Sequence, residues 1–94
     1  MSSVDFDKAA QQAGALDQAA QCLYAQSDRM GKIVSELSAL WHGDTADVYI
    51  RELNAFSGQL RLEAKRCSIA AEAFHARITE FQDTEIEEVL PFTP

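Results

Sequence analysis

Glu72 and His75 are the two side chains whose types and spacing come closest to those of a reactive site. Residues three apart lie on one face of a helix, and a Glu-x-x-His step supplies metal ligands in di-iron four-helix bundles. Such a site also needs inward glutamates on neighbouring helices, and the first half of the chain offers only Glu36. We therefore expect Glu72 to lie on the surface and His75 to be half-exposed, and a di-metal bundle protein is the remote alternative.

The two cysteines, Cys22 and Cys67, are the other reactive side chains. They lie at similar heights if the chain folds into a hairpin, so a cross-helix disulfide is the alternative to two reduced core thiols, which we expect. The sequence has no nucleophile, base and orienting group at usable spacing and no glycine-rich phosphate loop. We expect no enzyme, no catalytic residue, no metal and no cofactor.

The charge of the chain limits its partners. A net charge of −7 and a pI near 4.6 argue against nucleic acid, which basic side chains bind by neutralising phosphates. The acidic excess lies mostly in residues 82–94, which carry four Asp or Glu and no Lys or Arg. No apolar run approaches the roughly 18 residues of a membrane span, and residues 1–5 lack the pattern of a cleavable signal. We expect a cytoplasmic protein at synthesis, with no membrane insertion, whose export would use no signal peptide.

The pattern of apolar residues predicts an all-α fold in a single domain, 1–94. One helix is expected over about 4–41, capped by Ser3 or Asp5, and a second over about 45–88, capped by Asp44 or Thr45. The turn at 42–44 joins them into an antiparallel two-helix hairpin. Pro91 and Pro94 predict a flexible tail over 89–94, which follows the acidic residues of 83–88.

Each predicted helix has an apolar row expected to face the other helix. In the first, residues recur every seven positions with further apolar residues three positions on; in the second, they recur at steps of three and four. The first row is Leu16, Ala19, Leu23, Met30, Ile33, Leu37 and Leu40, and the second is Tyr49, Leu53, Phe56, Leu60, Cys67, Ala71, Phe74, Ile78 and Phe81.

The second helix has another apolar row on its opposite side, which a hairpin alone would leave exposed. We interpret it as a partner interface that completes a four-helix bundle, because two helices cannot enclose a core by themselves. Its residues, here called the outer stripe, are Val48, Ala55, Leu62, Ile69, Ala73 and Ala76.

Trp41 and Gly43 lie almost at the midpoint of the chain, between the two predicted helices. Glycine tolerates the backbone conformation that ends a helix, and the tryptophan ring is expected to cover the joint. This central Trp-x-Gly turn in a short, alanine-rich hairpin resembles the WXG family of small type VII secretion proteins. The resemblance implies a helical hairpin that pairs with itself or with a different helical protein and is exported without a classical signal peptide.

Phe81 and Glu85 match the family's C-terminal export signature, Tyr-x-x-x-Asp/Glu, with Phe in place of Tyr. That variant is similar to the small helical partners of LXG toxins. The resemblance implies an accessory or targeting protein that binds the helical N-terminal domain of such a toxin, or another small helical protein, and the secretion machinery. The alternatives are a self-pairing secreted substrate and, for Phe81, a core position that continues the apolar row.

Overall fold

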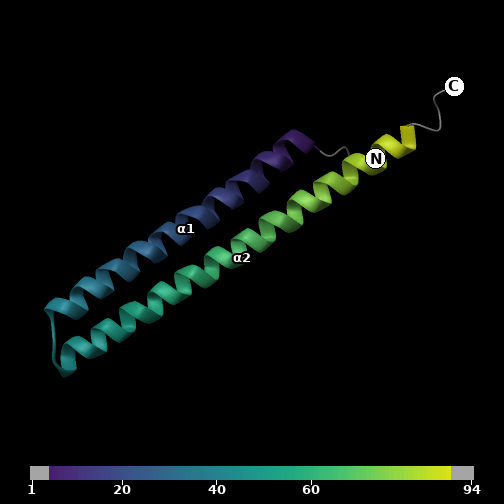
Figure 1. Cartoon of the computed structure of the whole chain (residues 1–94). Helices are drawn as coiled ribbons and strands as arrows, with labels where there is room; N and C mark the ends of the chain where they lie inside the picture. The colour runs from purple at the N-terminus through teal and green to yellow at the C-terminus, as the bar shows by residue number, and fades with distance from the viewer. Residues whose placement is uncertain (1–4, 90–94) are drawn as a thin grey trace.

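The chain forms two long helices joined by a short turn (Figure 1). The structure, a computed structural model, describes residues 5–89, and the side chains of residues 5–83. Helix α1 spans Phe6–Leu40 and helix α2 spans Asp44–Val89. The helices run antiparallel, and α2 extends beyond the start of α1 (Figure 1). The molecule is 79 Å long and only 18 by 14 Å across, so each helix is packed on one side only.

Both helices begin close to where the sequence predicts. Asp5 caps α1, because its carboxylate accepts a hydrogen bond from the Lys8 amide at 3.0 Å. The cap of α2 is Gly43, whose carbonyl accepts the first helical hydrogen bond from the Asp47 amide at 2.9 Å. The prediction of Asp44 or Thr45 as the cap was therefore wrong by one or two residues. Asp44 lies inside the first turn, where its charge complements the helix dipole.

Small side chains fill the contact between the helices. The buried residues of α1 are spaced seven apart, as are Ala64 and Ala71 of α2, and half-buried residues lie between them. This spacing keeps one narrow line of each helix against the other, and alanine lets the two backbones approach closely. We call this line the seam; its buried members are Ala13, Ala20, Ser27 and Val34 of α1 and Ala46, Ala64 and Ala71 of α2.

Two serines join the helices at the middle of the seam. Ser27 Oγ donates to the Ser57 carbonyl at 2.9 Å, and Ser57 Oγ donates to the Ser27 carbonyl at 3.0 Å. Ser27 is only 3% exposed, so its hydroxyl needs this partner. Because both acceptors are backbone atoms, the pair fixes the height of one helix against the other.

The prediction for the row of α1 was right for its seven-residue repeat and wrong for the residues three positions on. Leu16, Leu23, Met30 and Leu37 are half-buried and flank the buried residues of the seam, whereas Ala19, Ile33 and Leu40 are exposed.

The prediction for the row of α2 was right for the smaller residues and wrong for the aromatic ones. Leu53, Leu60, Cys67 and Ile78 are half-buried and Ala71 is buried, but Tyr49, Phe56, Phe74 and Phe81 are each about half exposed. The physical reason is the same in both helices. A seam of alanine and serine brings the backbones too close for aromatic rings to fit between them, so the larger side chains lie along its edge.

Candidate functional site: the uncovered apolar surfaces

The turn between the helices is built by Trp41, Gly43 and Tyr49. Trp41 ends α1 in an extended conformation, and its amide donates to the Leu37 carbonyl at 2.8 Å. Gly43 has a φ of 116°, which only glycine adopts without strain. The Trp41 ring stacks on Tyr49, with ring centroids 6.0 Å apart, and thereby joins the end of α1 to the start of α2. Trp41 and Gly43 therefore shape the turn, as their positions in the sequence predict.

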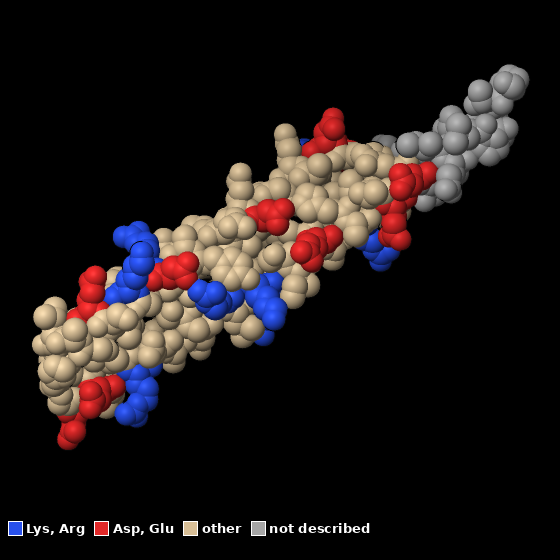
Figure 2. Space-filling view, in the orientation of Figure 1, with Lys and Arg blue, Asp and Glu red and all other residues tan. Residues whose placement is uncertain are grey.

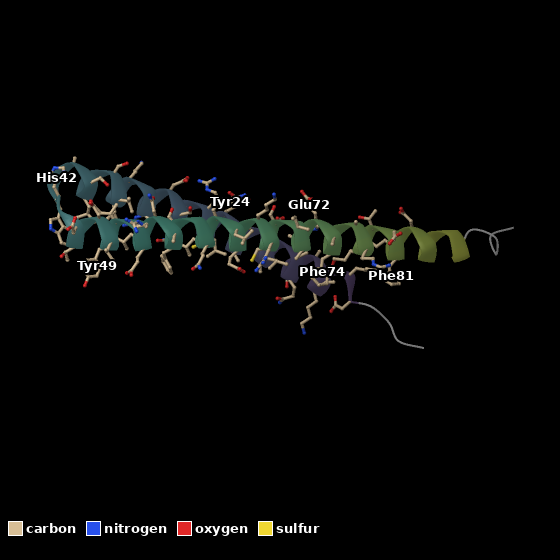
Figure 3. The ribbon with its side chains drawn as sticks, turned by 90° about the horizontal axis from the view of Figure 1, so that it is seen from below. Tyr24, His42, Tyr49, Glu72, Phe74 and Phe81 are labelled. Atoms are coloured by element: carbon tan, nitrogen blue, oxygen red, sulfur yellow. The ribbon has the colours of Figure 1, made fainter. Side chains whose placement is uncertain are left out.

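The four aromatic residues of α2 that miss the seam all lie along one edge of it. At about 100° per residue, Tyr49, Phe56, Phe74 and Phe81 fall on the same side of the helix. The side chains of Tyr49, Phe74 and Phe81 extend from one side of α2, and Glu72 extends from the other (Figure 3). Each of the four rings is about half exposed. Their uncovered surface would favour burial against another apolar surface.

Helix α1 adds apolar residues to the same side of the hairpin. Ala9, Leu16 and Ala19 line an open groove of about 780 Å³ together with Phe74, Ile78 and Phe81 of α2. Leu23, Met30 and Leu37 continue the seven-residue repeat of Leu16 and lie on the same edge of α1. Both helices thus contribute to one broad surface. We call it the apolar face; it comprises Leu16, Leu23, Met30 and Leu37 of α1 and Tyr49, Phe56, Phe74 and Phe81 of α2.

The outer stripe of α2 is a second exposed apolar surface. All six residues that the sequence assigns to it are exposed, and the three largest, Val48, Leu62 and Ile69, are each about half exposed. The stripe lies on the side of α2 away from the seam, so no part of α1 covers it. Alanines at Ala55, Ala73 and Ala76 would let another helix approach closely. The site residues predicted for partner binding therefore form one exposed row along α2.

The predicted export signature lies near the far end of α2. Phe81 is about half exposed and lines the groove beside α1. The alternative that Phe81 is a core residue is therefore only partly right, because half of its side chain stays exposed. Helix α2 continues through Glu85 to Val89, which places Phe81 and Glu85 one turn apart. The side chain of Glu85 lies outside the described residues, as does the predicted tail beyond Val89.

The side of the hairpin opposite the apolar face is polar. Arg61 forms an ion pair with Asp28 across the helices at 2.6 Å and lies over the Tyr24 ring, 5.8 Å from its centroid. His75 contacts Asp17 at 3.3 Å, with both side chains about half exposed. These groups point into solvent, where an ion pair stabilises a fold by less than about 1 kcal/mol. Charged side chains of both signs are spread along the molecule (Figure 2).

The chemically reactive side chains do not converge. Glu72 is exposed, and His75 contacts Asp17 rather than forming a pair with Glu72. Among the residues with described side chains, no group of three or more His, Cys, Asp or Glu is placed to hold a metal ion. Cys22 and Cys67 are free thiols. The expectation of two core thiols was wrong for Cys22, which is exposed, whereas Cys67 is half-buried.

The fold and its surfaces define an all-α helical hairpin with two uncovered apolar rows. No helix within the described residues is both long and apolar enough to cross a membrane. No protein-family model, characterised protein or solved structure matches the chain.

Sequence reasoning missed two features of these surfaces. The first is Ser27 and Ser57; the repeat Ala13, Ala20, Ser27, Val34 would have found the seam if small residues had been counted equally with large ones. The second is the stacking of Tyr49 on Trp41, because Tyr49 was assigned to the row that packs on α1.

Proposed function

We propose that this chain is a small, non-enzymatic accessory or targeting protein of type VII secretion. It binds a helical partner, either the N-terminal domain of an LXG-type toxin or another small helical protein, and helps its export. The observation that carries the proposal is the outer stripe, a row of exposed apolar residues on a hairpin whose centre is a Trp-x-Gly turn. The resemblance to the WXG family supports a role in type VII secretion, and the exposure of the outer stripe supports binding of a helical partner there.

A helical partner suits the outer stripe because the stripe is straight and its small residues are interspersed with larger ones. Val48, Leu62 and Ile69 present side chains that a second helix would cover, and the alanines between them leave room for its backbone. The seam of the hairpin itself shows how closely this chain packs against a helix where its residues are small.

The stripe is tested with single charges. Leu62→Glu and Ile69→Glu each place an unpaired carboxylate in the proposed interface and should weaken partner binding by about 2 kcal/mol or more, roughly 30-fold in Kd. Asn54→Glu introduces the same charge at an exposed position on the polar side of α2 and is the matched control. Binding is measured by calorimetry with the purified partner. Wild-type affinity in both stripe variants would show that the partner binds elsewhere.

The export signature is tested separately from folding. Glu85→Ala changes a carboxylate near the end of α2, where a negative charge is unfavourable to the helix dipole, so the variant should fold as wild type does. We expect it to bind its partner normally and to lose export of the complex. Phe81→Ala is the second variant, because Phe81 also belongs to the apolar face. Normal secretion from a strain carrying both substitutions would show that Phe81 and Glu85 are not an export signature.

A second candidate within the same family is a self-pairing secreted substrate. The apolar face favours it, because this face is a separate surface that a partner on the outer stripe would leave uncovered. The two candidates differ in what is exported. A self-pairing substrate is secreted at the wild-type level from a strain that lacks any toxin partner, whereas an accessory protein is required for the toxin to leave.

A further inference from the structure

The outer stripe of α2 follows a strict seven-residue repeat. Five of its six members are spaced seven apart along about 42 Å of helix: Val48, Ala55, Leu62, Ile69 and Ala76. A seven-residue repeat keeps one line of a helix against another helix that runs beside it with a slight left-handed supercoil. A helix that lies on a membrane has a wide apolar face instead and does not require this spacing. The stripe therefore fits a partner helix that follows α2 over most of its length.

A second row runs beside the stripe, about 40° farther round the helix, and most of it is polar. Its members lie four residues after successive stripe residues, and all of them are exposed: Glu52, Gln59, Arg66 and Ala73. We call the first three the polar row. Positions separated by alternating steps of four and three share the contact between two helices, so a helix on the stripe also covers the polar row. Along α2 the polar row presents an acid, an amide and a base.

Arg66 is the member of the polar row that most needs a partner group. Its guanidinium contacts Glu63 at 2.7 Å, and both side chains are more than half exposed. Glu63 lies about 60° farther from the stripe, so a helix on the stripe covers Arg66 before it covers Glu63. A covered arginine that meets only apolar groups weakens binding, whereas a carboxylate accepts hydrogen bonds from its remaining N–H groups. The same reasoning, with the opposite sign, applies to Glu52.

We propose that the outer stripe selects its helical partner by charge. The partner helix carries an apolar row interrupted by a basic side chain at the height of Glu52 and by an acidic side chain at the height of Arg66, about 21 Å apart. A polar side chain between them meets the amide of Gln59. The inference rests on the proposed function, because it names the chemistry of the partner that the outer stripe binds.

A closed dimer of this chain on the outer stripe does not supply that pattern. In a parallel pair related by a two-fold axis, Glu52 meets Glu52 and Arg66 meets Arg66, and like charges repel. An antiparallel pair that brings Glu52 to Arg66 is centred on Gln59. Leu62 then lies at the height of Phe56, which is not in the stripe, so the two stripes do not meet. The occupant of the outer stripe is therefore a different chain.

Charge reversal tests the pattern, with the N-terminal helical domain of the native host's LXG-type toxin as the probe. Glu52→Arg and Arg66→Glu each set like charges against the partner, and we expect each to raise the Kd by about tenfold or more in low salt. Arg66→Met removes the charge without reversing it and should raise the Kd less. The matched controls are Glu36→Arg and Arg29→Glu, which make the same changes at exposed positions of α1 and should bind as wild type does. Calorimetry measures the Kd.

A double variant and a rescue distinguish a different chain from a second copy. Glu52→Arg/Arg66→Glu should bind the domain more weakly than either single variant, because both charges then oppose the partner. In the Arg66→Glu background, the acidic residues of the domain are changed to arginine one at a time. One of these changes should restore most of the lost affinity and thereby identify the residue that meets Arg66.

The outcomes separate this inference from the proposed function. Charge-reversal variants that bind as wild type does, or no more weakly than the α1 controls, would overturn the inference while a loss of binding in Leu62→Glu keeps the proposed function. Wild-type affinity in the double variant would overturn it as well. So would assembly of the purified chain with itself that Leu62→Glu abolishes, because a second copy would then occupy the stripe. A wild-type chain that does not bind the domain would overturn the inference together with the toxin-partner form of the proposed function.

Discussion

Ala64→Leu tests the close approach of the two helices. Ala64 is 0% exposed, and Ala20 is 1% exposed. The Ser27–Ser57 contact fixes their relative height, because seven residues back along α1 and seven forward along α2 lead to Ala20 and Ala64. The leucine adds three carbon atoms at a fully buried position of the seam, at the height of another buried alanine. Overpacking of this kind costs about 1–3 kcal/mol, and the variant should unfold about 4–8 °C lower for each kcal/mol lost.

Thermal unfolding followed by circular dichroism at low protein concentration measures the effect on the single hairpin. Ala73→Leu is the matched control, because Ala73 is exposed on the outer stripe. This substitution should change the unfolding free energy of the hairpin by no more than about 0.5 kcal/mol. A melting temperature for Ala64→Leu equal to or above that of wild type would refute the close-packed seam. The helices would then be separated widely enough to accept a leucine.

Two further substitutions probe the turn and the serine pair. Gly43→Ala should destabilise the hairpin by about 1–2 kcal/mol, because alanine is strained at a φ of 116° even though nothing lies within 4 Å of the added carbon. Gly58→Ala, in the middle of α2, should instead stabilise the hairpin by up to about 1 kcal/mol. Urea unfolding measures both changes in unfolding free energy and distinguishes their signs. Ser57→Ala removes the donor to the Ser27 carbonyl and should cost about 0.5–1 kcal/mol relative to the exposed control Ser38→Ala. Equal stability of the two variants would show that the Ser57 hydroxyl contributes nothing.

The architecture could be predicted from the sequence because its signals are local. Asp5 offers a side chain that caps a helix, Gly43 requires a positive φ, and the apolar spacing of both halves is helical. None of these signals depends on which residues of α1 pack against which residues of α2. The exposure of the outer stripe could be predicted as well, because residues opposite a seam remain outside in a two-helix structure.

The seam could not be located in the same way. An apolar row beside a contact and an apolar row within it have the same period, so Leu16 and Phe56 could be assigned to the seam without any conflict in the sequence. What decides between them is the distance between the helices, and that distance is set by Ala20, Ser27 and Ala64. The sequence pattern therefore assigns the large residues to the contact between the helices, whereas in the structure they form the apolar face. The pairing of Tyr49 with Trp41 depends on the same placement.

We propose that this chain carries a helical partner to type VII secretion through its outer stripe. The most direct test is to delete the gene in its native host, supply it again as wild type, Leu62→Glu or Asn54→Glu, and measure by immunoblotting the partner toxin released into the medium. We expect release to be lost on deletion, to return with wild type and Asn54→Glu, and not to return with Leu62→Glu. Undiminished release from the deletion strain would contradict it.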